Sequence, residues 1–92
     1  MGNEVNEAEK IESVVRAVIR DILGVSQHRV DAFTHKTGLF GSLPELDSMA
    51  VANLLTELED RLGIIIDDDE VDSDMLEDFG GLIHFCQRKV KG

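Results

Sequence analysis

The sequence predicts an all-α fold, a small four-helix bundle with three longer helices, one short helix and a long loop between the first two. Two observations predict it. Apolar residues recur at helical spacing in three separate segments, and the single strand-like segment has no partner strand. The chain has 92 residues, of which 42% are hydrophobic and 4% aromatic, so we expect one domain over residues 1–92 with an aliphatic core. Residues 1–6 and 90–92 are expected to be flexible.

The first helix is predicted over residues 7–23 and ends at Gly24, which can supply a left-handed cap. One face of this helix is apolar, with Ile11, Val14, Val15, Val18, Ile19 and Ile22. Residues 25–46 show no sustained period and contain three turn formers, so we expect an irregular loop. Five apolar residues are expected to hold this loop on the core: Val30, Phe33, Leu39, Phe40 and Leu43.

The second helix is predicted over residues 48–62, with Asp47 or Ser48 as its N-cap and Gly63 at its end. Its inward stripe is formed by Val51, Leu54, Leu55, Leu58 and Leu62. Residues 64–66 are three isoleucines, which we interpret as an extended linker that buries one or two of its side chains.

The last third of the chain holds a short and a longer helix. A helical turn is expected near residues 73–76, and a helix over residues 78–89 with Asp78 as its N-cap. Gly80 and Gly81 cost this helix about 1 kcal/mol each relative to alanine, and we expect them to leave room for another helix. Cys86, the single cysteine, excludes an internal disulfide and is expected to be buried.

Charge restricts the partners. The formal net charge of −10 argues against nucleic acid, and 13 acidic residues but only one basic residue lie between residues 45 and 78. These acids form either a solvated face or a docking surface for basic partner proteins. No apolar run could span a membrane and no signal-peptide pattern is present, so we expect a cytoplasmic protein.

Asp47 and Ser48 stand where the loop gives way to the second helix, so the serine is expected to be exposed. The N-terminus of a helix favours anions, which makes this a suitable position for a phosphate-linked group. His28 and His35 lack a metal-ligand spacing, and we expect no metal site. The acidic run after Asp67 fits no EF-hand register, because Val71 or Ser73 and Phe79 fall on required positions.

Asp47-Ser48-Met49 resembles the Asp-Ser-Leu attachment motif of the acyl carrier proteins, and the resemblance extends over nearly the whole chain. Residues 57–64 resemble the end of the family's second helix, and residues 79–85 resemble the start of its last helix. The resemblance implies that a phosphopantetheinyl transferase modifies Ser48 with 4′-phosphopantetheine from coenzyme A. The thiol of that group then carries acyl thioesters between enzymes, while the protein, a monomer, catalyses nothing itself.

The resemblance also implies a role for residues around Ser48. Asp47 and Met49 would flank the attachment site. Basic patches of the transferase and of an acyl-activating ligase, acyltransferase or synthase would meet the acids Glu57, Glu59, Asp60, Asp69 and Glu70. An acyl chain would be sheltered by Leu54, Leu58, Ile64, Ile66 and Leu82, unless these residues simply fill the core.

Ala50 and Asn53 stand where carriers of bulk fatty acid synthesis often have acids, so the pathway is expected to be a specialised one. Residues 43–51 resemble those of bacterial carriers linked to exopolysaccharide or exosortase systems. Two alternatives stay open: a peptidyl or aminoacyl carrier that uses the same serine, and an unmodified acidic interaction domain in which Ser48 is only a cap.

Overall fold

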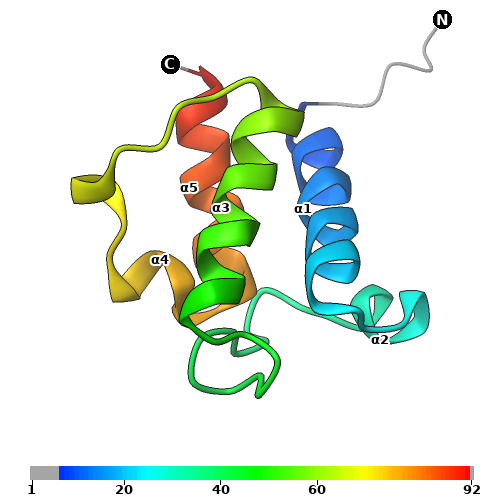
Figure 1. Ribbon diagram of the computed structural model, residues 1–92. Coiled ribbons are helices and arrows are strands. Elements are labelled where there is room, and N and C mark those ends of the chain that lie inside the picture. The colour runs from blue at the N-terminus through cyan, green and yellow to red at the C-terminus, as the bar shows by residue number, and fades with distance from the viewer. Residues whose placement is uncertain (1–6, 92) are drawn as a thin grey trace, which may run out of the picture.

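The computed structural model describes residues 7–91 and shows a helical bundle (Figure 1). The three longer helices are α1 (Glu7–Leu23), α3 (Ser48–Leu62) and α5 (Phe79–Lys91). The shorter ones are α2 (Gln27–Asp31), the 3-10 turn η1 (Asp68–Glu70) and α4 (Ser73–Glu77). α3 and α5 run in the direction opposite to α1 (Figure 1). The all-α prediction is confirmed, since the described residues contain no strand and only one isolated bridge, Gly38–Asp78.

The limits of the predicted helices agree closely with the structure. α1 spans the predicted residues 7–23 and α3 the predicted residues 48–62, while α5 begins one residue later than expected and ends two residues later. Residues 90 and 91, expected to be flexible, belong to α5, whereas residues 1–6 and 92 lie outside the described residues. No helix between residues 7 and 91 has the length and apolar character needed to cross a membrane.

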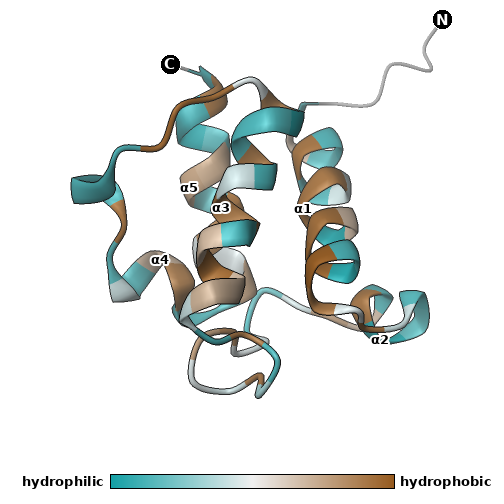
Figure 2. Ribbon diagram, viewed as in Figure 1, coloured by the Kyte–Doolittle hydropathy of each residue, from teal (hydrophilic) through white to brown (hydrophobic). Residues whose placement is uncertain are grey.

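The core lies between α1, α3 and α5, with the loop residues packed at one end. Brown and teal bands alternate along these helices in Figure 2, as expected for helices with one apolar face. The fully buried side chains include Val15, Val18, Ile19, Leu54, Leu58, Phe79, Leu82, Ile83 and Cys86. Burial raises the pKa of the Cys86 thiol to about 12, so this cysteine is a core residue, as expected.

The loop between α1 and α3 corrects one prediction, because it contains the short helix α2. Its N-cap is Ser26, whose hydroxyl accepts a hydrogen bond from the Arg29 backbone N–H at 3.1 Å. Four of the five residues expected to hold the loop are buried: Val30, Phe33, Leu39 and Leu43. The prediction for Phe40 was wrong, since its side chain is 47% exposed.

Backbone hydrogen bonds join this loop to the junction of α4 and α5. Four such bonds of 2.9 to 3.0 Å connect Leu39 N to Glu77 O, Phe40 N to Leu76 O, Phe79 N to Thr37 O and Gly80 N to His35 O. A Cβ atom on Gly80 would lie 2.9 Å from the Cβ and the carbonyl oxygen of His35. Gly80 therefore leaves room for the loop and not for another helix. Gly81 does lie against a helix as expected, since a Cβ atom there would be 3.0 Å from the Asp74 carbonyl oxygen of α4.

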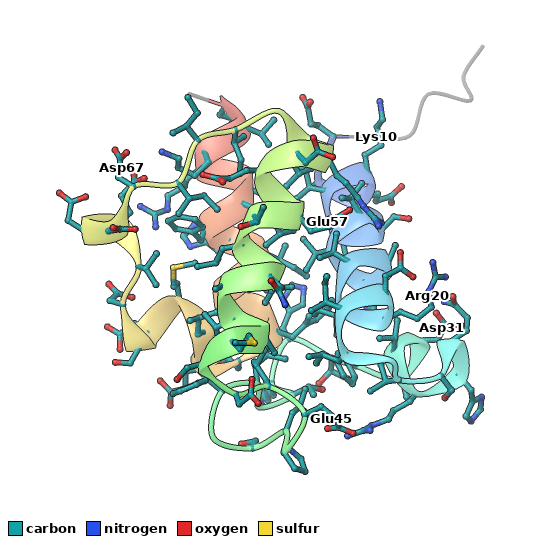
Figure 3. All side chains as sticks on the ribbon, viewed as in Figure 1. Lys10, Arg20, Asp31, Glu45, Glu57 and Asp67 are labelled. Carbon is teal, nitrogen blue, oxygen red and sulfur yellow. The ribbon has the colours of Figure 1, made fainter. Side chains whose placement is uncertain are left out.

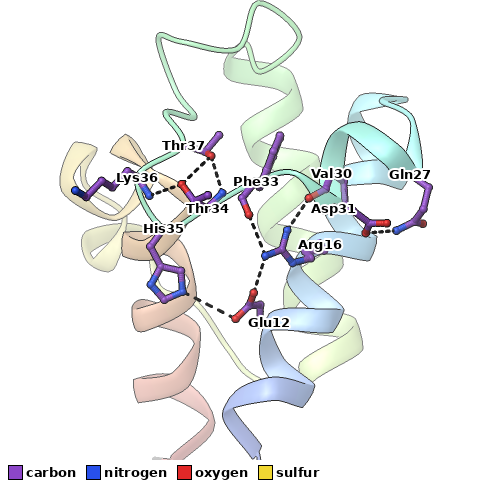
Figure 4. A network of polar contacts seen from close by, with 10 residues as sticks. All are labelled: Glu12, Arg16, Gln27, Val30, Asp31, Phe33, Thr34, His35, Lys36 and Thr37. Carbon is purple, nitrogen blue, oxygen red and sulfur yellow. Dashed lines mark hydrogen bonds and ion pairs between the residues drawn. The ribbon is translucent and has the colours of Figure 1, made fainter.

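Arg16 anchors the other side of the loop (Figure 4). Its guanidinium donates to the carbonyl oxygens of Val30 at 2.6 Å and Phe33 at 3.1 Å, and to the Glu12 carboxylate at 2.6 Å. The same group lies 4.6 Å from the centroid of the Phe79 ring. One side chain of α1 thus fixes both ends of the turn that follows α2 and stacks on the first residue of α5.

Candidate functional site

Ser48 is the first residue of α3, and its side chain is exposed. The N-cap is Asp47, whose Oδ1 accepts a hydrogen bond of 2.8 Å from the Ala50 backbone N–H. Because Asp47 provides the cap, the Ser48 hydroxyl is not used for that purpose. The next residue, Met49, is 74% exposed, so Ser48 is approachable from solvent at the positive end of the helix dipole.

The segment before Ser48 is held on both sides. The Leu43 and Leu46 side chains are buried in the core. Between them, the Glu45 carboxylate accepts two hydrogen bonds from the Arg29 guanidinium, at 2.7 and 3.4 Å. The Arg29 guanidinium, helped by a backbone hydrogen bond, holds the pKa of Glu45 below its usual value. α2 thereby fixes the direction from which the chain enters α3.

A groove of about 480 Å³ extends from Ser48 along α3. One wall is a single stripe of the helix, formed by Ser48, Val51, Ala52, Leu55, Thr56 and Glu59. The residues of this wall recur at intervals of three or four, and the eleven-residue separation between Ser48 and Glu59 corresponds to about 16 Å of helix. The opposite wall is formed by Ile66, Asp68 and Val71, which lie on the segment around η1. The volume falls within the roughly 300–1,000 Å³ of small-molecule pockets.

Of the five residues expected to shelter an acyl chain, the structure brings only Ile66 to this groove. Leu54, Leu58 and Leu82 are fully buried in the core, and Ile64 is nearly so. Sequence reasoning missed the groove residues Ala52, Thr56 and Val71 and assigned Val51 and Leu55 to the inward stripe. The signal that finds the α3 wall is the helical stripe that starts at Ser48 itself.

Three of the five acids expected to bind partners are bonded within the chain. Glu57 pairs with Arg61 at 2.8 Å, Glu70 pairs with Lys89 at 2.9 Å, and the Glu59 carboxylate accepts the Ile66 backbone N–H at 2.7 Å. The other two, Asp60 and Asp69, are exposed. The acidic surface therefore has less uncompensated charge than a count of its carboxylates suggests.

The family model described as "Phosphopantetheine attachment site" matches residues 13–83, which include Ser48 and the groove. A solved structure, the solution NMR structure of a holo acyl carrier protein from Nitrosomonas europaea, is 36% identical in sequence with a TM-score of 0.80. The match covers 91% of this chain and 99% of that one. The chain belongs to the acyl carrier protein family. No curated protein matches the chain significantly.

Acyl carrier proteins are non-catalytic carriers with a covalently attached 4′-phosphopantetheine, and they work with a phosphopantetheinyl transferase and partner enzymes. The residues at the start of α3 fit such a group. An exposed hydroxyl stands at a helix N-terminus that favours a phosphodiester, and a groove with apolar residues on both walls begins beside it. Within the described residues, no group of three or more histidine, cysteine or acidic side chains could hold a metal ion.

Proposed function

We propose that Ser48 is the attachment site of this acyl carrier protein. The observation that supports it is the position of the Ser48 hydroxyl: exposed, next to a residue that already caps the helix, and at the mouth of the groove. When bound, 4′-phosphopantetheine supplies a terminal thiol that holds acyl groups as thioesters.

The residues around Ser48 would act as supports. The N-terminus of α3 stabilises an exposed anion by roughly 0.3–1 kcal/mol, which favours a phosphodiester on Ser48. Asp47 keeps the first turn of α3 formed, and Met49 offers the transferase an apolar contact. Val51, Leu55, Ile66 and Val71 give the groove the apolar surface on which an acyl chain could lie.

Partner enzymes would recognise the acidic surface near the groove. Asp60 and Asp69 are exposed and bear charge that a basic patch of a transferase, ligase, acyltransferase or synthase could meet. Glu57 and Glu70 contribute less, because each is already paired with a basic residue of this chain. We expect the carrier to act as a monomer in the cytoplasm.

The specialised pathway expected from the sequence remains a proposal. Asn53 is exposed on α3 and Ala50 is half-buried at its first turn, so neither adds charge to the half of the helix nearest Ser48. A dedicated acyl-activating ligase would suit such a surface. A peptidyl or aminoacyl cargo would use the same attachment chemistry.

Intact-protein mass tests the attachment site. The protein is incubated with coenzyme A, magnesium and a broad-specificity phosphopantetheinyl transferase, beside the variants Ser48→Ala and Ser13→Ala. Ser13 is also an exposed helical serine and serves as the matched control. We expect wild type and Ser13→Ala to gain one phosphopantetheine and Ser48→Ala to gain none. An equal gain on Ser48→Ala would place the group elsewhere, and no gain on the folded wild type would favour an unmodified interaction domain.

A further inference from the structure

Glu59 organises the end of the groove that is distant from Ser48. α3 ends at Leu62, and Gly63 follows with a left-handed φ of 66° and donates its N–H to the Glu59 carbonyl oxygen. The Ile64 N–H is directed to the same carbonyl at 3.2 Å. The Glu59 side chain then turns to accept the Ile66 N–H at 2.7 Å. A single residue thus holds three of the four backbone N–H groups of residues 63–66.

This contact determines where Ile66 lies. Residues 63–67 form the connection between α3 and η1. In this connection Ile64 is buried and Ile65 is 75% exposed, so successive side chains point inward and outward in turn, and Ile66 lies against the bundle again. Ile66 forms part of the groove wall that faces the α3 stripe, and Glu59 belongs to that stripe. The hydrogen bond between them therefore crosses from one wall of the groove to the other.

The geometry changes the role expected for Glu59. A carboxylate that docked a basic enzyme would be exposed and directed to solvent, whereas this one is half-buried and bonded to backbone. The Ile66 N–H is itself partly buried, and a partly buried donor without an acceptor is costly. Removal of the carboxylate would release the connection from α3.

We infer that Glu59 is a positioning residue that fixes the width of the groove and so determines how well an aliphatic acyl thioester is protected from water. The inference rests on attachment at Ser48. The five apolar residues on the groove walls, all aliphatic, favour an aliphatic cargo, and Glu59 acts on it only through the position of Ile66.

Amide hydrogen exchange of the unmodified protein provides the first test. Glu59→Ala removes the acceptor, Glu59→Asp keeps the charge on a shorter side chain, and Glu59→Gln keeps an acceptor oxygen of equal reach. Glu77→Ala is the matched control, because it removes an exposed glutamate that lines neither the groove nor the proposed docking surface. We expect the Ile66 amide to exchange at least tenfold faster in Glu59→Ala and Glu59→Asp, and at nearly the wild-type rate in the other two. Unchanged exchange in folded Glu59→Asp would overturn the inference.

Thioester hydrolysis provides the second test. The transferase loads each variant directly from octanoyl-coenzyme A, and loss of the octanoyl group is followed by intact mass after the transferase is removed. We expect several-fold faster hydrolysis in Glu59→Asp and Glu59→Ala than in wild type, Glu59→Gln or Glu77→Ala. Equal hydrolysis in all loaded variants overturns the role of Glu59 and leaves attachment at Ser48 intact. A wild-type protein that acquires no octanoyl-phosphopantetheine overturns the attachment proposal itself.

Discussion

At the scale of single residues, two neighbours divide the tasks at the start of α3. Asp47 accepts the Ala50 N–H and stabilises the helix, while Ser48 leaves its hydroxyl exposed. A serine that capped the helix would engage its hydroxyl in the fold. If Ser48 is the attachment site, as proposed, its hydroxyl can react without loss of the cap, so the two functions can be separated by mutation.

The first prediction follows from this division. Asp47→Ala removes the acceptor of the Ala50 N–H and should lower the free energy of unfolding by about 1 kcal/mol. Ser48→Ala, at an exposed position without a cap role, should stay within about 0.5 kcal/mol of wild type. Urea denaturation of both variants measures the difference. A larger loss in Ser48→Ala than in Asp47→Ala would show that the cap is assigned to the wrong residue.

Arg29 and Glu45 give a second prediction, on pKa. Replacement of Arg29 by Gln removes the charged donor that mainly lowers the pKa of Glu45, so this pKa should rise toward its usual value. NMR titration of the carboxyl carbons measures it. Asp21 is an internal control, because its lowered pKa depends on Arg61 and Arg20 and should not move.

The sign of the pH effect follows from the same pair. The folded pKa of Glu45 is lowered, so the pair stabilises the fold above the unfolded pKa of glutamate, about 4.3, and the contribution is lost as pH falls through the folded value. The stability difference between wild type and Arg29→Gln should therefore shrink below about pH 4.3. A difference that grows on acidification would contradict the pairing.

At the scale of elements, Gly80 shows how the loop constrains α5. Alanine is the better helix former by about 1 kcal/mol, yet the added Cβ would lie 2.9 Å from backbone and side-chain atoms of His35. Because the Gly80 N–H also bonds to the His35 carbonyl, neither segment can move aside freely. Gly80→Ala should therefore destabilise the protein despite its helix propensity.

Thermal unfolding checks this third prediction. His84→Ala, an exposed position on the same helix, gains helix propensity without a clash and is the control. We expect a lower Tm for Gly80→Ala and an equal or higher Tm for His84→Ala. A stabilised Gly80→Ala variant would show that the contact between α5 and the loop is loose.

The sequence predicted the elements that have a hydrophobic period and missed those that do not. α1, α3 and α5 are long enough to show an apolar stripe, and Gly24 and Gly63 mark the ends of two of them with positive φ angles. α2 buries only Val30 in five residues, so no period is visible, although the Ser26 cap was a usable signal. η1 spans three residues and buries none of them.

The candidate site was predictable at Ser48 and less so along the groove. The position of Ser48 before an amphipathic helix indicates exposure, and the structure agrees. Whether Leu54 or Val51 faces the groove depends on how far the helix is rotated about its axis and on where residues 64–71 cross it. Neither quantity is encoded in the period alone, so core residues were expected in place of groove residues.

At the scale of the whole molecule, charge is distributed unevenly. The formal net charge is −10, yet the last fourteen residues contain three bases and no acid. Lys89 of this basic end reaches back to Glu70, and Arg61 bridges Glu57 to Asp21 of α1. These pairs hold the acidic segments to the bundle, and Asp60 and Asp69 remain exposed carboxylates on the acidic part of the surface.

The last prediction concerns salt. If the acidic surface attracts basic enzymes, the KM of the phosphopantetheinyl transferase for this carrier should rise several-fold as NaCl increases toward 0.3 M, because screening shortens the Debye length below about 8 Å. The kcat should change little, since the chemistry occurs after docking. Replacement of Asp60 and Asp69 by Asn should raise the KM at low salt and flatten its salt dependence.

Asp31→Asn is the control for this prediction. Asp31 lies on α2, and Figure 3 shows it on the side of the molecule opposite to Asp67, the residue that precedes η1. A KM that is independent of salt would show that the acids form a solvated face and that docking depends on apolar contacts such as Met49.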